Sequence, residues 1–318
     1  MRALICGIGG QDGGYLAKLL LDKGYEVYGT SRDIHLMSGR GLHVLGIACQ
    51  VTLCSMAIND FRSVLSVLAS VKPDEVYNLA GQSSVGLSFE QPVETMESIA
   101  IGTLNLLEAI RFINPSIHFY NASSSECFGD TGGEPANENT AFRPRSPYAV
   151  AKATAFWQVA NYRDAYKLHA SSGILFNHES PMRPERFVTR KIVTTACRIA
   201  QGSTEKLILG DINIQRDWGW APDYVEAMWL MAQQDTGGDY VVATEHTVSL
   251  AYFVERVFTE LKLNWQEHVE SDPDLYRPSE IRISRGNTAH IRSELGWQPR
   301  FKVEDVVKEM VNYQLSIT

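Results

Sequence analysis

Three glycines near the start of the chain constrain its fold more than any other feature. Gly7, Gly10 and Gly13 form a G-x-x-G-x-x-G run that follows a short apolar segment, residues 3–6, and opens a segment with helical spacing, residues 13–23. Glycine is needed at such a turn because the backbone must reverse tightly and approach a pyrophosphate at a helix N-terminus. Three glycines can also form a purely structural turn, but their place between a strand and an amphipathic helix favours a dinucleotide-binding unit.

Short apolar runs alternate with amphipathic segments through the first half of the chain. Such alternation is typical of parallel β-α-β units and predicts an α/β fold with a doubly wound parallel sheet of the Rossmann type. Beyond the first strand and helix, strands are expected at residues 26–30, 75–79, 118–122 and 170–176, and helices at residues 61–70, 97–112 and 147–166.

The character of the sequence changes after residue 176. Residues 177–190 (NHESPMRPERFVTR) are polar, contain proline and are rich in arginine, as expected of a functional loop, and a further helix is expected near residues 224–234. We therefore expect a cofactor-binding Rossmann domain at residues 1–176 and a smaller, interleaved C-terminal substrate-binding lobe at residues 177–318, with some later segments returning to the sheet.

Charge and cysteine content exclude several classes of function. The 318-residue chain has a net charge of −8, which argues against a general nucleic-acid or anionic-membrane binder because both reward basic surfaces. The cysteines are scattered, with no CxxC pair and no metal-ligand spacing, so we expect reduced thiols and no metal site. The first apolar run is too short for a signal peptide, and no run approaches the ~18 apolar residues of a membrane helix. We expect a cytoplasmic protein with no nucleic-acid or membrane partner.

The end of the second strand indicates which dinucleotide is bound. The chain reads Thr30-Ser31-Arg32 there, and a hydroxyl beside a guanidinium suits the 2′-phosphate of NADP. An acidic residue at this place would instead hold the ribose hydroxyls of NAD. Asp33, one residue later, is the rival interpretation, and a solvated surface arginine at position 32 is the other alternative. NADP is favoured over NAD.

A tyrosine and a lysine lie four residues apart in the sequence YAVAK. Tyr148 and Lys152 therefore share one face of the expected helix. A phenol is a poor base at its ordinary pKa of ~10, but an adjacent fixed cation favours the phenolate. The Y-x-x-x-K pattern occurs by chance in many proteins, so its meaning depends on what surrounds it.

A serine-rich strand end precedes this helix and supplies that context. It reads NASSSE over residues 121–126, at the carboxyl edge where parallel sheets present their site residues. Taken alone, the serines are compatible with a plain turn and Glu126 with a solvated carboxylate. Together, Ser124, Glu126, Tyr148 and Lys152 form a set of hydroxyl, base, phenol and ammonium, which we interpret as a catalytic site around one nicotinamide.

These segments carry a family resemblance. The chain resembles the extended short-chain dehydrogenases/reductases and, more narrowly, the GDP-mannose 4,6-dehydratases, over nearly its whole length. The run NHESP…FVTRKI is the most discriminating, because generic epimerases of the superfamily lack it. The matching segments are GIGGQDGGYLAKLLLDKGYEVYG (7–29), PDEVYNLAGQSSVGLSFEQP (73–92), ASSSECFG (122–129), RSPYAVAKA (145–153), GILFNHESP (173–181), FVTRKI (187–192) and RDWGWAPDYVEAMW (216–229).

The resemblance implies a reaction. In the family, a phenolate at the position of Tyr148 removes the proton of the sugar 4-hydroxyl while hydride leaves carbon 4 for NADP. A glutamate at the position of Glu126 takes the proton from carbon 5, water is eliminated across carbons 5 and 6, and the hydride returns to carbon 6. The product is a 4-keto-6-deoxy nucleotide sugar. Ser124 stands where the family usually has threonine and keeps the hydroxyl that can hydrogen-bond the sugar 4-oxygen, while Ser125 is expected behind it or at the cofactor.

The remaining site residues combine the motifs above with the resemblance. A GDP-sugar carries a pyrophosphate that needs local cations, whatever the net charge of the chain, and Lys191, Arg216 and Arg277 are the candidates. Arg183 and Arg190 fit surface charges or subunit contacts equally well. The expected cofactor contacts are Gly7, Gly10, Gln11, Asp12, Gly13, Ser31, Arg32, Asp60, Leu79, Ala80, Gln82, Tyr148, Lys152 and His178, and the expected substrate contacts are Ser84, Asn177, Lys191, Arg216, Arg277 and Glu280.

Three stretches depart from the family pattern. The usual Arg-Arg-Ser-Ser stretch, which reaches a neighbouring subunit, is replaced by SRDIHLMSGR, so homodimer and homotetramer both stay open. The G-D-L-x-D run that touches adenine is replaced by one that ends in Asp60. Residues 182–186 read MRPER instead of the usual RRGET, a change that can alter sugar specificity without altering the chemistry.

Two alternatives to a dehydratase remain. A reductase or epimerase acting on a related nucleotide sugar would have no use for a second base at Glu126. A catalytically silent cofactor-binding regulator would be expected to lack the tyrosine or the lysine, and both are present.

Overall fold

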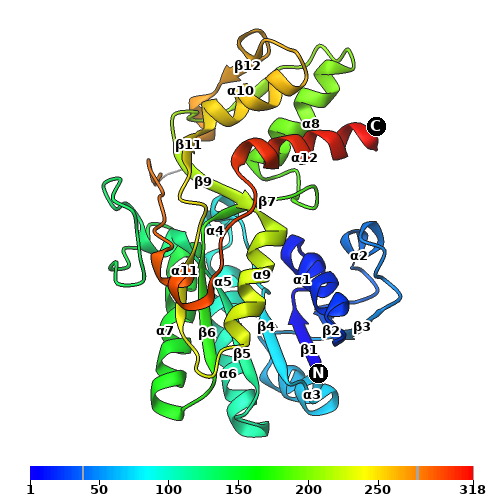
Figure 1. Ribbon diagram of the computed structural model, residues 1–318, viewed down its shortest axis with the longest axis vertical. Helices are drawn as coiled ribbons and strands as arrows, with labels where there is room; N and C mark the ends of the chain where they lie inside the picture. Colours follow the sequence, from blue (N-terminus) through cyan, green and yellow to red (C-terminus); the bar gives the residue numbers. More distant parts are fainter. Residues whose placement is uncertain (38, 277–278, 318) are drawn as a thin grey trace.

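Seven parallel strands form the central sheet of the computed structural model, which describes residues 1–37, 39–276 and 279–317 (Figure 1). Their order is β10-β6-β5-β4-β1-β2-β3, with parallel pairing throughout. The order reverses between β1 and β4, the place where doubly wound sheets bind ligands. This confirms the predicted fold class. The strands are β1 (Arg2–Cys6), β2 (Glu26–Ser31), β3 (Val51–Ser55), β4 (Glu75–Asn78), β5 (His118–Ser124), β6 (Ala170–Leu175) and β10 (Asp239–Val242).

Helices cover both faces of this sheet, which is why its strands are apolar on both sides. Along β1, Ala3 and Ile5 face the core under α1 and α9, whereas Leu4 and Cys6 face the core under α3 and α6. This follows from the two-residue period of a strand. The covering helices are α1 (Gln11–Asp22), α2 (Arg40–Val44), α3 (Phe61–Val71), α4 (Val85–Glu90), α5 (Pro92–Met96), α6 (Gly102–Ile113), α7 (Pro147–Tyr166) and α9 (Ala221–Ala232).

Two strands of the central sheet were not among those expected from the sequence, and one expected helix is divided. β3 is the edge strand beyond β2, and β10 is a later segment that pairs with β6 at the opposite edge. The helix expected at residues 97–112 begins with a π-helical turn, η1 (Glu97–Ile101), which continues from α5 and leads into α6. Pro92 at the start of α5 accounts for the earlier beginning.

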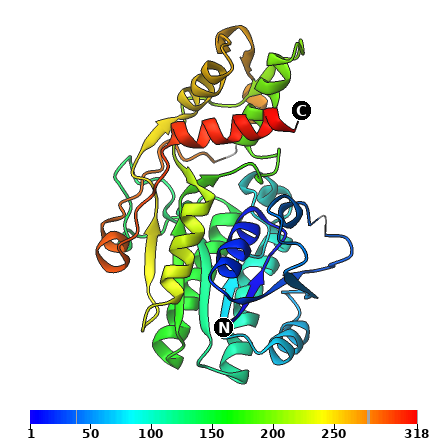
Figure 2. The same cartoon turned by 45° about the vertical axis from the view of Figure 1, so that its right-hand side comes forward.

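The C-terminal lobe lies above the sheet in both views (Figures 1 and 2). It has a three-stranded sheet of β11 (Thr247–Ser249), β9 (Gln215–Trp220) and β7 (Asn177–Glu179), and a two-stranded sheet of β8 (Leu207–Leu209) and β12 (Val269–Ser271). Trp218, Phe253 and Met310 belong to the core that the lobe builds around its helices. The helices of this core are α8 (Val188–Ala200), α10 (Leu250–Glu260) and α12 (Val303–Ser316).

Segments of the second half also return to the first domain. α9 contributes Tyr224 and Met228 to the core beside α1, and Ile291 of α11 (Ala289–Leu295) joins the same core. No helix within the described ranges is long and apolar enough to cross a bilayer. In the same part of the chain, no three His, Cys, Asp or Glu side chains are grouped as they would be around a metal ion.

Candidate active site

A cleft of about 470 Å³ lies where the sheet meets the lobe. The ends of β5 and β6, the first turns of α7 and α8, and strands β7, β8 and β9 all contribute to its wall. All four expected catalytic residues line it. The cleft also contains many of the expected cofactor and substrate residues, namely Asp12, Leu79, Ser84, Asn177, His178, Lys191 and Arg216.

The local structure explains how the catalytic set is assembled. β5 ends at Ser124, whose Oγ accepts a hydrogen bond from the N–H of Glu126 at 3.3 Å and begins the 3₁₀ turn η2 (Ser125–Phe128). Ser146 caps α7 by accepting from a first-turn N–H at 3.1 Å, and a proline at the next position favours the helix start. Tyr148 therefore stands in the first turn of α7, and Lys152 stands one turn later.

Contacts between these elements bring the side chains together. The Ser124 hydroxyl is near enough to the Tyr148 phenol to favour its ionised form. The Nζ of Lys152 donates to the Ala122 carbonyl at 2.7 Å and lies 5.8 Å from the centroid of the Tyr148 ring. Glu126 lines the same cleft. The structure therefore unites a hydroxyl, a phenol, an ammonium and a carboxylate from a strand end and the following helix, as the sequence predicted.

Burial dominates the pKa values of the tyrosine and of the lysine. Burial raises the pKa of Tyr148 above its ordinary value, and the opposing effects of the Ser124 hydrogen bond and the Arg183 charge are smaller. Burial also lowers the pKa of Lys152, to about 8. In this structure, loss of solvation therefore outweighs the contacts that favour the phenolate.

The glycine run forms a tight cradle. Gly7 has a φ of +88°, and a Cβ there would lie 2.9 Å from the Ala80 nitrogen and from the Leu79 oxygen. A Cβ on Gly13 would lie 2.6 Å from the Gly7 oxygen. Gly10 is the N-cap of α1 and provides no side-chain cap, so first-turn N–H groups stay available to an anion. These features fit the pyrophosphate of a dinucleotide.

A cluster of polar side chains joins the start of α1 to β7. The Nε2 of His178 lies 2.9 Å from Asp12 Oδ2, and its ring stacks on Tyr224 with centroids 4.4 Å apart. Gln11 donates to the His178 carbonyl at 3.1 Å and accepts from Ser180 at 2.8 Å. Burial alone would lower the pKa of His178, but the Asp12 carboxylate raises it overall, and this histidine in turn contributes to the lowered pKa of Asp12. The cofactor roles of these residues stay predictions.

The residues at the end of β2 take part in local contacts. Arg32 is paired with Glu94 at 3.2 Å, with the guanidine side chain 75% exposed. The carboxylate of Asp33 accepts two backbone N–H groups of its own loop, from residues 35 and 36, at 2.8 and 3.4 Å. Ser31 has a long contact of 3.4 Å to the Asp33 carbonyl.

Three other expected ligand residues also serve local structure. Asp60 caps α3 by accepting from the N–H of residue 62 at 2.9 Å. Gln82 donates to the Ser84 carbonyl at 2.8 Å, and the Ser84 hydroxyl caps α4. Their contacts with cofactor or substrate stay predictions. Arg277 lies outside the described residues.

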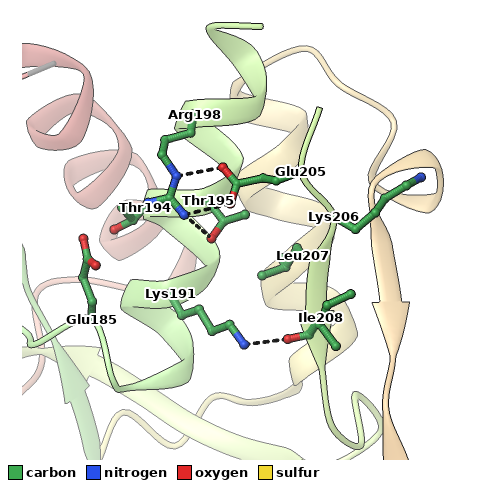
Figure 3. Close-up of a pocket in the computed structure, with 9 residues that line it drawn as sticks. All are labelled: Glu185, Lys191, Thr194, Thr195, Arg198, Glu205, Lys206, Leu207 and Ile208. Atoms are coloured by element: carbon green, nitrogen blue, oxygen red, sulfur yellow. Dashed lines mark hydrogen bonds and ion pairs between the residues drawn. The ribbon is translucent and has the colours of Figure 1, made fainter. Parts of the chain in front are cut away.

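The expected phosphate-binding cations already have partners inside the protein. Arg216 is buried and pairs with Glu280 at 2.7 Å. Lys191 donates to the Ile208 carbonyl at 2.7 Å, across the gap between α8 and β8 (Figure 3). Arg183, which the sequence left undecided, lines the cleft and lies 3.3 Å from the buried carboxylate of Glu179. The NHESP motif was the available signal for this buried glutamate.

A second, smaller hollow, with a volume of about 190 Å³, is lined by residues of α8 and β8 (Figure 3). Lys191 and Ile208 line both spaces. The pair Arg198–Glu205, with Nε and Oε1 2.8 Å apart, bounds the smaller one. None of the four catalytic candidates lines this hollow, so the chemistry is assigned to the larger cleft.

Comparison with known proteins identifies the family. The sequence model of the family "GDP-mannose 4,6 dehydratase" matches residues 4–310. GDP-mannose 4,6 dehydratase 1 of Arabidopsis thaliana is 47% identical, with 99% of this chain and 90% of the relative covered. The GDP-mannose 4,6-dehydratase of Sinorhizobium fredii is 45% identical over 99% of this chain and 96% of its own. The human GDP-mannose 4,6 dehydratase is 41% identical over 99% and 91%.

Solved structures share the fold. A dTDP-glucose 4,6-dehydratase from Streptomyces venezuelae, crystallised with NAD, superposes with a TM-score of 0.89 at 20% identity, covering 99% of this chain and 97% of that one. The Pseudomonas aeruginosa protein RMD, solved with NADPH, gives a TM-score of 0.82 at 22% identity and covers 100% and 99%. Both nicotinamide dinucleotides therefore occur on this fold.

Proposed function

The chain belongs to the GDP-mannose 4,6-dehydratase family, and from this premise we propose that it converts GDP-D-mannose to GDP-4-keto-6-deoxy-D-mannose with NADP as its recycled cofactor. The observation that carries the proposal is the presence of Glu126 in the same cleft as Ser124, Tyr148 and Lys152. An enzyme that only oxidises or reduces an alcohol carbon needs Ser124, Tyr148 and Lys152, but not Glu126. The carboxylate supplies the second base that an elimination requires.

The side chains have separate tasks in this reaction. Tyr148 takes the proton of the sugar 4-hydroxyl, and Ser124, which lines the same cleft, holds the sugar 4-oxygen. Lys152, fixed by the Ala122 carbonyl, is the cation that favours the phenolate when that proton is transferred. A nicotinamide dinucleotide bound in the glycine cradle supplies the hydride acceptor for carbon 4 and the donor for carbon 6.

Glu126 acts on the other half of the sugar. Once carbon 4 is a ketone, the proton on carbon 5 is acidic, and Glu126 removes it while the 6-hydroxyl leaves as water. The protein's contribution to this step is a carboxylate held in a fixed turn directly after β5, so the two bases stand on one strand-helix unit.

Two contacts support NADP over NAD as the cofactor. Oδ1 of the Asp33 carboxylate accepts two backbone N–H groups of its own loop, so a ribose hydroxyl has to compete for this oxygen. Among the residues that the structure describes, the ion-pair partner of Arg32 is Glu94, in an exposed pair, and such pairs contribute about 0–1 kcal/mol. A 2′-phosphate therefore competes easily for the guanidinium.

The proposal is tested by product analysis in heavy water. Incubation with GDP-mannose and catalytic NADP should give the 4-keto-6-deoxy product with deuterium at carbon 5, as read by NMR. Glu126→Gln should lower the elimination rate by at least about 10²-fold, and reduced cofactor should accumulate because the oxidation at carbon 4 remains possible. Tyr148→Phe is the matched control and should give neither signal.

Other results would support a different member of the superfamily. Net consumption of NADPH, or a product that retains its 6-hydroxyl, would indicate the alternative reductase or epimerase. If the protein converted another nucleotide sugar but not GDP-mannose, the proposed reaction would stand and the proposed substrate would be wrong. Activity that does not respond to Tyr148→Phe would remove the site assignment altogether.

Assembly and location complete the proposal. A homodimer or homotetramer is supported by apolar side chains exposed on two adjoining helical segments, Ile101 of η1 and Val150 and Trp157 of α7. Light scattering of the protein and of Trp157→Glu should show the oligomer and its weakening. A cytoplasmic location is supported by the cysteines, all of which are free thiols.

A further inference from the structure

The cations of the cleft differ in what they bind. Lys152 and Lys191 donate to main-chain carbonyls at 2.7 Å. Arg183 and Arg216 face carboxylates, at 3.3 and 2.7 Å. Arg186 also lines the cleft and is exposed, and it has no hydrogen bond or ion pair with any residue in the described ranges. In that part of the chain, every other lysine or arginine of the cleft has a carboxylate or carbonyl partner. Arg186 has none.

We propose that Arg186 pairs with the diphosphate of the nucleotide-sugar substrate and so sets this chain's affinity for it, an inference that rests on the function proposed above. The residue stands in the MRPER segment, where the family usually has RRGET. The usual pattern has an uncharged threonine where this chain has Arg186, so the contact is not part of that pattern.

The local structure directs this guanidinium. Residues 184–187 form a turn closed by a 3.0 Å hydrogen bond from the Phe187 N–H to the Pro184 carbonyl. The guanidinium of Arg186 lies 5.2 Å from the Phe187 ring centroid, and that of Arg183 lies 3.9 Å from it. Contacts of this kind hold a cation over a ring face. A side chain that is already oriented loses less entropy when it binds a ligand.

The adjoining helix adds to the attraction for an anion. Phe187 is the N-cap of the 13-residue helix α8 and gives it no side-chain cap. Val188, Thr189 and Lys191 of its first turns line the cleft. Unsatisfied N–H groups and the positive end of the helix dipole favour negative charge there. An unpaired guanidinium beside this helix end suits a phosphate, because both attract the same charge.

The existing partners of the other cations explain why Arg186 should affect substrate affinity. To bind phosphate, Arg216 has to share its guanidinium with Glu280, and Lys191 has to give up or share a carbonyl. Within the described part of the chain, Arg186 has no hydrogen bond or ion pair to give up, and its ring contact is with Phe187. In a chain of net charge −8, a cation that is not neutralised internally has a disproportionate effect on an anionic ligand.

The test measures GDP binding by calorimetry, with Arg186→Thr and Arg186→Lys compared with the wild type in the presence of NADP. Arg186→Thr should weaken GDP about 5-fold or more and reduce the salt dependence of its Kd. Arg186→Lys should retain most of the affinity, and guanosine, which carries no phosphate, should bind all three proteins alike. In turnover, KM for GDP-mannose should rise with kcat little changed.

A control variant isolates position from net charge. Arg111→Thr removes the same charge from the exposed end of α6, where the residue pairs with Glu108, and should leave GDP binding unchanged. Equal GDP affinity for wild type and Arg186→Thr, or an equal loss in Arg111→Thr, would overturn the role of Arg186 and leave the proposed function intact. A wild type that turns over another nucleotide sugar and does not bind GDP would overturn both.

Discussion

Two adjacent glycines in the first turn of α1 allow a direct test of the cradle. A Cβ on Gly13 would meet three backbone atoms, the Gly7 oxygen at 2.6 Å, the Ile8 Cα at 2.7 Å and the Ile8 oxygen at 2.8 Å. A Cβ on Gly14 would meet the flexible end of Leu45 at 3.3 Å and otherwise nothing closer than 4.0 Å. Both glycines are buried in the same helix. The two alanine variants should therefore differ mainly in the atoms that the added Cβ contacts.

The expected magnitudes follow from these contacts. Alanine in place of glycine inside a helix gains about 0.8–1 kcal/mol. Overpacking a rigid environment costs about 1–3 kcal/mol, and backbone atoms have less freedom to move aside than side chains. Gly14→Ala should therefore be neutral or more stable than the wild type. Gly13→Ala should be about 1–2 kcal/mol less stable and should push Gly7 out of the cradle.

Urea unfolding followed by circular dichroism measures the stability, and titration of NADP followed by tryptophan fluorescence measures the cradle. Gly13→Ala should raise the Kd for NADP at least about 10-fold, which is about 1.4 kcal/mol, while Gly14→Ala leaves it unchanged. The argument would fail if Gly13→Ala matched Gly14→Ala in both measurements. In that case the backbone around residues 7 and 8 would yield freely, and close packing would not be the reason for glycine.

Three further predictions concern charged groups. Asp12 raises the pKa of His178. The pair should therefore contribute fully to the free energy of unfolding below the ordinary histidine pKa, and this contribution should disappear as pH rises through the raised pKa. In urea unfolding at several pH values, Asp12→Asn should show a smaller loss of stability over this range. Burial raises the pKa of Asp217 to about 6 against the donors of Thr244, so its ionisation should cost about 3 kcal/mol of stability between pH 4 and pH 6. Asp217→Asn should remove that slope, and a slope that persists would assign it to other groups. Lys152→Met should reduce turnover by about 10²–10⁴-fold with GDP binding unchanged, whereas a similar loss of GDP binding would contradict a purely catalytic role.

The sequence was most informative where local chemistry dictates local structure. The glycine run predicted β1 and α1, and Ser146-Pro147 opens α7 at the expected residue, with Tyr148 and Lys152 one turn apart. These elements are predictable because a turn, a cap or a four-residue spacing acts within a few residues. β3 and β10 were missed because each is a short edge strand of four or five residues, and a run of that length has little periodicity to detect.

The partners of the site residues could not be predicted either, and the reason is that they are distant in the sequence. Asp12 and His178 are 166 residues apart in the chain, and Arg216 and Glu280 are 64 residues apart. No local pattern links such pairs, because their meeting depends on how the lobe closes over the sheet. The raised pKa of Tyr148 could not be predicted from the sequence either, since burial depends on the whole fold.

The catalytic residues and the proposed substrate-recognition residue lie on different kinds of structural element. Ser124 and Lys152 are at most 9% exposed and belong to β5 and α7, elements whose spacing is set by the sheet and by the bond from Lys152 to the Ala122 carbonyl. Arg186 is exposed in a short turn between two elements. Loops change composition at little cost to the scaffold, whereas catalytic groups need positions fixed within about 0.5 Å. Differences within residues 182–186 among family members should therefore change KM and substrate preference while leaving kcat for the accepted sugar nearly constant.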